Sequence, residues 1–143
     1  MTLEIKISKK LIPYKSAFKF LKKRVDSLKK QKGEDLLWIL EHHLTFTGGI
    51  RSKNNEILDK KIKIIETNRG GKITLHNPGQ KIVYFVLDLN KKKKDIRNLV
   101  KQIELSIIEF LKLYNIKNYA DKENIEIRVN DKKINKIEIR LYK

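Results

Sequence analysis

The sequence predicts an α/β or α+β layer fold with two helices packed on β-sheet. Two segments repeat apolar residues at helical spacing, and seven shorter segments alternate or run apolar as strands do. The chain has 143 residues, of which 40% are hydrophobic, which is enough for one compact core. We therefore expect a single domain over residues 1–143.

The N-terminal third predicts a strand, a helix and a second strand. Leu3, Ile5 and Ile7 alternate with polar residues over 2–7, as in a strand. Pro13 suits the first turn of the helix that follows, and Gly33 is expected to end that region. Residues 35–41 are apolar on both faces and predict a central strand buried on each side. The helix stripe consists of Tyr14, Ala17, Phe18, Leu21, Val25 and Leu28.

The middle of the chain predicts a long loop followed by three strands. Residues 47–59 are polar and contain paired glycines, so we expect a loop there, and long loops in compact domains are often functional. Strands are expected at 61–66, 72–76 and 81–87, with a turn at Asn77-Pro78-Gly79 before the last.

The C-terminal part predicts the clearest helix, over 95–114, and then a hairpin. Strands near 124–129 and 133–141 are joined by Asn130-Asp131, a pair that suits a tight turn. The helix stripe consists of Ile96, Leu99, Val100, Ile103, Ile107, Phe110, Leu111 and Tyr114.

Composition narrows the function classes without choosing one. The net charge of +17 predicts attraction to polyanions, but an AT-rich coding sequence explains the excess of Lys, Ile and Asn equally well. The absence of cysteine excludes disulfides, thiolate metal sites and a cysteine nucleophile within these residues. No apolar run approaches the ~20 residues of a membrane span, and the charged N-terminus is unlike a signal peptide. We expect a cytoplasmic protein that does not bind membranes.

Residues 66–80 are the most unusual segment. Gly70-Gly71 lets the backbone approach a ligand closely, Arg69 could hold an anion or position a carbonyl, and His76 could bond a reacting oxygen. Each residue alone has an ordinary explanation, as a turn glycine, a surface arginine or a satisfied histidine. Their concentration between two strands favours a functional site.

Other patterns are weaker. A single RGG triplet lacks the repetition of RNA-binding RGG segments, and no phosphate-binding glycine motif is present. His42 and His43, with His76, lack the carboxylates or thiols of a zinc site, and adjacent histidines on a strand point to opposite faces. We expect neither a metal nor a cofactor.

The segment ETNRGGKITLHNPGQKIVYFVLDL, with YKSAFKFLKKRV, LLWILEHHLTFTGG, YNIK and VNDKKI around it, resembles the octanoyltransferases of lipoate biosynthesis. These are relatives of the biotin and lipoate protein ligases, and the resemblance covers most of the chain. It implies a mixed, largely antiparallel sheet with flanking helices, and octanoyl transfer from acyl carrier protein to a lysine of lipoyl domains. It also implies an acyl pocket lined by Arg69, Gly70, Gly71, Lys72, Ile73, Thr74, Leu75 and His76.

The family's mechanism uses a cysteine that forms an acyl-enzyme, with a lysine that lowers the thiol's pKa. The resemblance assigns that lysine to Lys133, which is followed by Ile134. It places Lys136, Ile137 and Glu138 along the next stretch of the pocket. Asn135, Lys136 and Glu138 stand where the family has small residues and a glycine.

This chain departs from the family toward its C-terminus. The family's later HGF-type and PCG-type motifs, the second of which carries the cysteine, do not occur in these residues. Asn77 and Glu126 replace glycines, and Arg128 replaces a tryptophan, so charge would stand against an apolar chain. We expect a truncated, inactive octanoyltransferase that is a monomer when complete and self-associates when truncated. The alternative is a non-catalytic basic module that binds acidic carrier protein or nucleic acid.

Overall fold

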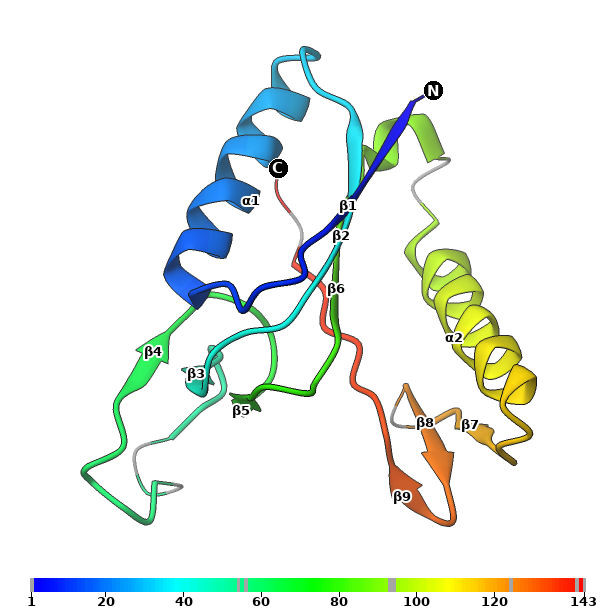
Figure 1. Ribbon diagram of the computed structural model, residues 1–143. Coiled ribbons are helices and arrows are strands. Elements are labelled where there is room, and N and C mark those ends of the chain that lie inside the picture. Colours follow the sequence, from blue (N-terminus) through cyan, green and yellow to red (C-terminus); the bar gives the residue numbers. More distant parts are fainter. Residues whose placement is uncertain are drawn as a thin grey trace. The chain divides into compact units, whose positions relative to one another are not determined.

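A computed structural model describes residues 2–53, 55, 57–92, 95–123, 125–140 and 142 (Figure 1). The chain divides into two compact units: Met1–Asp88 with Arg140–Lys143, and Leu89–Ile139. A single domain over the whole chain remains a prediction. No helix in the described ranges is long and apolar enough to cross a membrane.

The first unit contains a three-stranded sheet covered on one face by a helix. Strands β1 (Leu3–Ile7), β2 (Asp35–Leu40) and β6 (Ile82–Val86) lie in the order β1-β2-β6, with β1 parallel and β6 antiparallel to β2. Helix α1 (Tyr14–Lys29) begins after Pro13 and ends before Gln31, which adopts the left-handed conformation at φ 56°. The central position of β2 and the helix are confirmed, but Gln31, not Gly33, terminates the helix.

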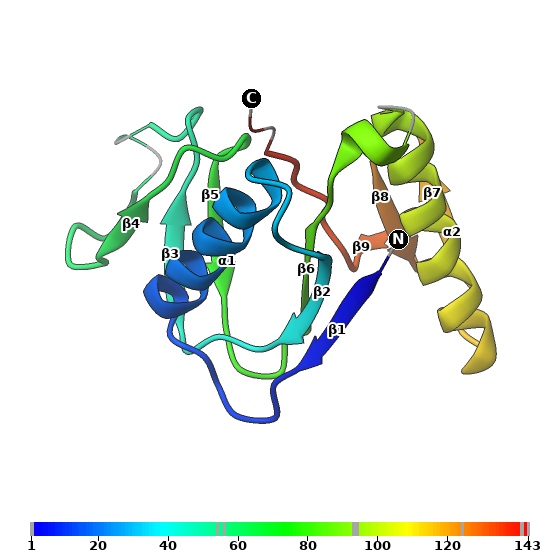
Figure 2. The same ribbon diagram turned by 90° about the horizontal axis from the view of Figure 1, so that it is seen from above.

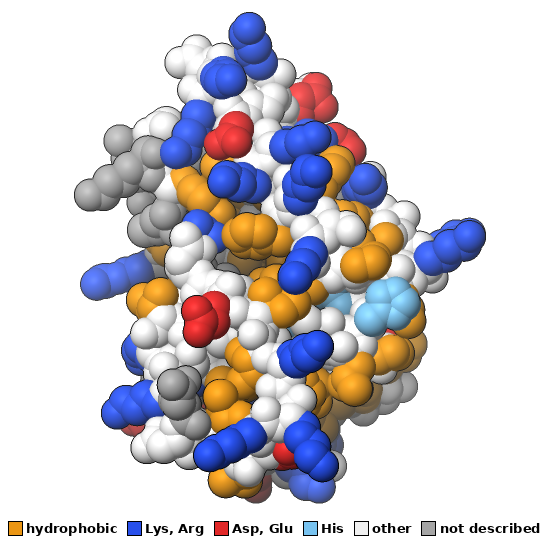
Figure 3. All heavy atoms as spheres, turned by 90° about the vertical axis from the view of Figure 1, so that its left-hand side faces the viewer, with side chains coloured by type: hydrophobic (Ala, Val, Ile, Leu, Met, Phe, Trp, Pro, Cys, Tyr) orange, Lys and Arg blue, Asp and Glu red, His pale blue; other side chains and the backbone are white. Residues whose placement is uncertain are grey.

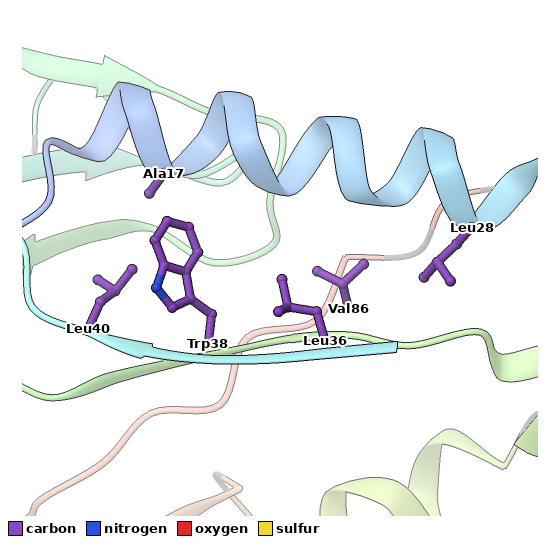
Figure 4. Packing of buried hydrophobic residues seen from close by; sticks show 6 residues of the cluster. All are labelled: Ala17, Leu28, Leu36, Trp38, Leu40 and Val86. Carbon is purple, nitrogen blue, oxygen red and sulfur yellow. The ribbon is translucent and has the colours of Figure 1, made fainter. Parts of the chain in front are cut away.

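The core of this unit lies between α1 and β2 (Figure 4). Leu36, Trp38 and Leu40 point from alternate positions of β2 toward α1, where Ala17 faces Trp38, and all four are almost fully buried. Leu37 and Ile39, on the other face, are half-buried, so the expected burial of β2 on each side is complete on only one face. Because strand side chains alternate, only one face of β2 meets α1.

Strand β1 turns its charged residues toward the helix. Glu4 pairs with Arg24 of α1, and the Lys6 ammonium lies 4.0 Å from the Phe20 ring centroid. The apolar residues of β1 are consequently on the opposite face, with Ile5 62% exposed. The alternation predicted the strand correctly, and the cation–π contact with Phe20 explains why the charged Lys6 side chain lies on the face toward the helix.

A second sheet of the same unit has the order β4-β3-β5, formed by β3 (Thr45–Gly48), β4 (Ile64–Glu66) and β5 (Ile73–His76). Figures 1 and 2 place β4 beside the N-terminal half of α1. Strand β3 overlaps the segment predicted as a loop from residue 47, which is a correction: Thr45-Phe46-Thr47 is rich in strand-forming side chains. Asn54 and Glu56, within that predicted loop, lie outside the described residues.

The second unit has one long helix and a three-stranded antiparallel sheet. After a short 3₁₀ helix (Leu89–Lys92), α2 (Ile96–Leu113) begins where the Asp95 carboxylate accepts a hydrogen bond from the Asn98 N–H, at 2.9 Å. The sheet order is β7-β8-β9, in which β7 (Tyr119–Asp121) was not anticipated.

The predicted hairpin is present but short. Strand β8 (Glu126–Val129) pairs with β9, which comprises only Lys132–Lys133, and Asn130 and Asp131 between them adopt φ 48° and 58°. A strand over 133–141 is therefore wrong within the described residues, and Leu141 and Asn124 lie outside them. One reason is that the Asn135 side chain accepts a hydrogen bond from the Ile127 N–H, where a backbone carbonyl would continue the ladder.

Candidate functional site

Two glycine-containing loops of the first unit lie against each other and form the candidate acyl-binding site. One is the segment from Gly49 to Arg51, which follows β3, and the other is the Arg69–Lys72 segment before β5. Three hydrogen bonds join the two loops. They run from the Gly49 N–H to the Lys72 carbonyl (3.0 Å), from the Ile50 N–H to the Arg69 carbonyl (3.0 Å), and from the Arg51 N–H to the Gly71 carbonyl (3.1 Å). Because all three are between backbone groups, they fix the path of both loops.

The contact between the loops requires glycine at Gly49. A Cβ atom there would lie 2.4 Å from the Gly71 carbonyl oxygen and 2.8 Å from that of Gly70. Gly71 itself has φ 86°, a conformation that side chains disfavour. Gly70 differs from both, because a Cβ there would meet no described atom within 4 Å. Gly70 is thus the position where the loop backbone borders open space.

The Arg69 side chain fastens its own loop to β3. Its guanidinium donates to the Thr47 carbonyl (3.0 Å), to the Thr47 hydroxyl (2.9 Å) and to the Gly70 carbonyl (2.8 Å). Thr47 is fully buried, so these bonds satisfy polar atoms that water does not reach. His76 Nε2 lies 3.4 Å from the same hydroxyl. Through these bonds Arg69 holds its loop against β3.

A cluster of aromatic rings lies around His76. Tyr14 stacks on it with a centroid separation of 5.6 Å, and His42 meets it edge-on, also at 5.6 Å. His42 is fully buried, with Nδ1 2.6 Å from the Ile12 carbonyl and Nε2 2.9 Å from the Tyr84 hydroxyl. A carbonyl can only accept, so Nδ1 carries the proton and Nε2 accepts from the tyrosine.

Burial lowers the pKa of His42, and the nearby His43 acts in the same direction, against the hydrogen bond to Ile12. Below the unfolded-state value of about 6.5 the unfolded chain takes up a proton that folded His42 resists. Stability is therefore expected to fall as the pH drops below about 6.5, until the folded-state pKa is reached.

We expect His42→Gln to flatten this pH dependence. Wild-type protein should lose at most about 1.4 kcal/mol of unfolding free energy per pH unit below pH 6.5 through this one proton. The variant should be less stable at pH 7.5 and show a smaller slope between pH 7 and 5 in urea titrations. The matched control is His43→Gln, because His43 is exposed; an equal loss of slope in that control would contradict the assignment.

The second unit contains Lys133, which has an acidic partner. Its ammonium lies 2.6 Å from the Glu126 carboxylate, which also receives the Arg128 guanidinium at 2.7 Å. Glu126 is almost fully buried, and the hydrogen bond from Lys133 and the Arg128 charge lower its pKa despite that burial. Arg128 in turn pairs with Asp121 on β7. Lys133 is thus held in a network on the β7-β8-β9 sheet.

The structure brings some of the expected site residues together. The range 69–76 forms one continuous segment of the first unit, in which Ile73, Thr74 and Leu75 are strand residues of β5. Lys133 and the 136–138 stretch belong to the second unit, where Lys136 pairs with Glu138 and Ile137 is half-buried. The role of each remains a prediction. Within the described ranges, no group of metal-ligating side chains is found.

Sequence reasoning missed several neighbours of the segment. Tyr14 was assigned to the helix stripe, and Thr47 and Gly49 to a polar loop. The available signal was the pair Gly48-Gly49, because two glycine pairs in one chain can meet through their backbones. The residues missed are Tyr14, His42, Thr47, Gly49 and Tyr84.

Comparison with known proteins agrees with this architecture. Residues 13–142 match the lipoyl protein ligase A/B catalytic domain. An octanoyltransferase of a Wolbachia strain from Brugia malayi is 36% identical over 96% of this chain and 69% of its own length. An octanoyltransferase of Buchnera aphidicola from Schizaphis graminum is 42% identical over 76% of this chain, which covers 52% of that enzyme.

Two solved structures share the fold at low sequence identity. P. falciparum LipL1, crystallised with lipoate, superposes with a TM-score of 0.62 at 19% identity, over 92% of this chain and 42% of its own. The bipartite lipoate protein ligase of Thermoplasma acidophilum also has a TM-score of 0.62, at 14% identity, over 93% of this chain and 55% of its own. The chain therefore belongs to the lipoyl protein ligase A/B catalytic domain family and is an octanoyltransferase-like member of it.

Proposed function

We propose that the first unit binds an octanoyl group against the Arg69–His76 segment. The observation that carries this proposal is Gly70, whose missing side chain leaves the loop backbone bordering open space while its neighbours are fixed. Arg69 stabilises that backbone from the β3 side, and His76, which stacks on Tyr14, lies 3.4 Å from the Thr47 hydroxyl that Arg69 also contacts. A rigid loop with a bare backbone suits close contact with an alkyl chain.

The octanoyl group would come from acyl carrier protein and be destined for a lysine of lipoyl domains, in the cytoplasm. This follows from the octanoyltransferase relatives, of which this chain spans 69% in the Wolbachia enzyme and 52% in the Buchnera enzyme. In that chemistry the ammonium of Lys133 would lower the pKa of a thiol. These 143 residues contain no cysteine, so we propose that they bind the acyl group without forming a cysteine thioester.

Gly70→Ala tests the binding proposal directly. The added methyl group has room and Gly70 has no left-handed φ, so we expect the free energy of unfolding to change by less than about 1 kcal/mol. Because the methyl group occupies the proposed path of the acyl chain, octanamide affinity should fall about fivefold or more. The measurement is a titration of ¹⁵N-labelled protein with octanamide, with acetamide as the short-chain reference.

The pattern of shifted resonances decides the result. Octanamide should move the amide signals of Gly70, Gly71 and Thr74, and acetamide should not. Gly79→Ala is the matched control, because a Cβ at Gly79 also meets no described atom within 4 Å, although its φ of 86° adds some strain. Unchanged octanamide affinity in Gly70→Ala would overturn the proposal.

A transfer assay tests the proposed absence of turnover. Octanoyl-acyl carrier protein and a lipoyl domain are incubated with this chain, and the mass of the lipoyl domain is followed. We expect no octanoyl adduct on either protein above the uncatalysed level. Turnover comparable to that of a cysteine-containing relative would show that another nucleophile operates.

A further inference from the structure

A basic groove lies between α1 and β4, and Gly70 is not among its lining residues. It encloses about 240 Å³, and its apolar floor is formed by Tyr14 and Phe18 of the helix and Ile65 of the strand. Tyr14 also stacks on His76, so the groove and the proposed acyl site meet at this ring. Thr67 closes the groove two residues before Arg69.

Lysines form the helical rim of the groove. Lys15, Lys19 and Lys22 follow each other at intervals of four and three residues, which places them on one face of α1 over about two turns. All are exposed, and none forms an ion pair within the described part of the chain. On the strand side Glu66 is the only acidic lining residue among those described. The rim therefore has an excess of positive charge.

The surroundings of the groove add to this charge. The Arg140 guanidinium lies 5.6 Å from the Phe18 ring centroid, and Asp26 is the only acidic residue in α1. Figure 3 shows the corresponding side of the molecule, where lysine and arginine side chains lie among hydrophobic ones. Basic and apolar surface are thus interleaved here, which favours a partner that offers both carboxylates and apolar side chains.

We propose that this groove docks an acidic amphipathic helix of the carrier protein that delivers the octanoyl group. A helix presents carboxylates at the same three- and four-residue intervals as the lysines, and an apolar side chain between them fits the floor of Tyr14, Phe18 and Ile65. A nucleic acid would engage the lysines through its phosphates but leave the apolar floor unused. This docking proposal rests on the proposed function, because the docked carrier protein would supply the acyl group to the adjacent site.

The test replaces Lys15, Lys19 and Lys22 together with Glu and measures binding of acyl carrier protein at 50 and 150 mM salt. Three lost attractions and the new repulsion should weaken the affinity by about tenfold or more. The control triple variant, Lys101→Glu, Lys117→Glu and Lys122→Glu, makes the same change in net charge on exposed lysines of the second unit. It should change the affinity by less than about threefold. Circular dichroism confirms that both variants fold.

Unacylated and octanoylated carrier protein separate this proposal from the proposed function. The groove should bind both forms, and the Lys15/Lys19/Lys22 variant should lose both. Gly70→Ala should lose only the extra affinity that the octanoyl group adds. Equal weakening in both triple variants, no binding of unacylated carrier protein at 50 mM salt, or tighter binding of a 20-nucleotide RNA than of carrier protein would overturn the docking site.

Discussion

Gly49→Ala is expected to lower the free energy of unfolding by about 3–5 kcal/mol, the largest effect that we predict for a single methyl group. The new Cβ would lie 2.4 Å from the Gly71 carbonyl oxygen, so the two loops must separate. Separation strains the backbone and breaks bonds such as the one between the Gly49 N–H and the Lys72 carbonyl. Urea denaturation monitored by the fluorescence of Trp38 measures the loss.

The matched comparison is Gly70→Ala, which adds the same group to the other side of the same contact. It should leave stability nearly unchanged, because its Cβ has room. If both variants lost the same free energy, the loops would not meet as the structure has them. In Gly49→Ala the displacement of the loop should also abolish octanamide binding, even at temperatures at which the variant is folded.

Arg69→Met is expected to cost about 2–4 kcal/mol of unfolding free energy. Methionine keeps part of the apolar stem but removes every donor, which leaves the buried Thr47 carbonyl and hydroxyl without the guanidinium. The loop should also become mobile, and amide exchange at Gly70 and Gly71 should accelerate. Hydrogen exchange and urea denaturation measure the two effects.

Arg51→Met is the control, because Arg51 lies in the opposite loop with an exposed side chain. Its stability should change by less than about 0.5 kcal/mol. Arg69→Lys distinguishes charge from geometry, since a lysine cannot reach the two Thr47 oxygens and the Gly70 carbonyl with one planar group. Full rescue by lysine would contradict the role assigned to the guanidinium.

Periodicity predicted the helices and the central strands because each carries an apolar stripe, although the stripe of α2 has no fully buried residue and Phe110 is 57% exposed. The stripe from Tyr14 to Leu28 became α1, and the run from Leu36 to Leu40 became β2. The hairpin at Asn130-Asp131 was also predictable, because its turn is set by local conformation. The short strands β7 and β9 could not be predicted in this way, because an alternation of apolar and polar residues cannot be recognised over three or two residues.

The candidate site was predictable in its central segment and not in its surroundings. Arg69, Gly70, Gly71 and His76 stood out because they are close in sequence. Thr47 and His42 contribute through contacts that span more than twenty residues, and no local pattern encodes these partners. A buried histidine next to an exposed one looks the same in the sequence as two exposed ones.

The ion pair between Lys133 and Glu126 has a consequence for any attempt to restore acyl-enzyme chemistry. Under the role proposed for Lys133, its ammonium should stabilise a thiolate, yet it already neutralises a buried carboxylate 2.6 Å away. A thiol supplied by design would compete with Glu126 for that charge. Replacing Glu126 with glycine would therefore have to precede the new cysteine, so the order of substitutions determines whether intermediate variants gain activity.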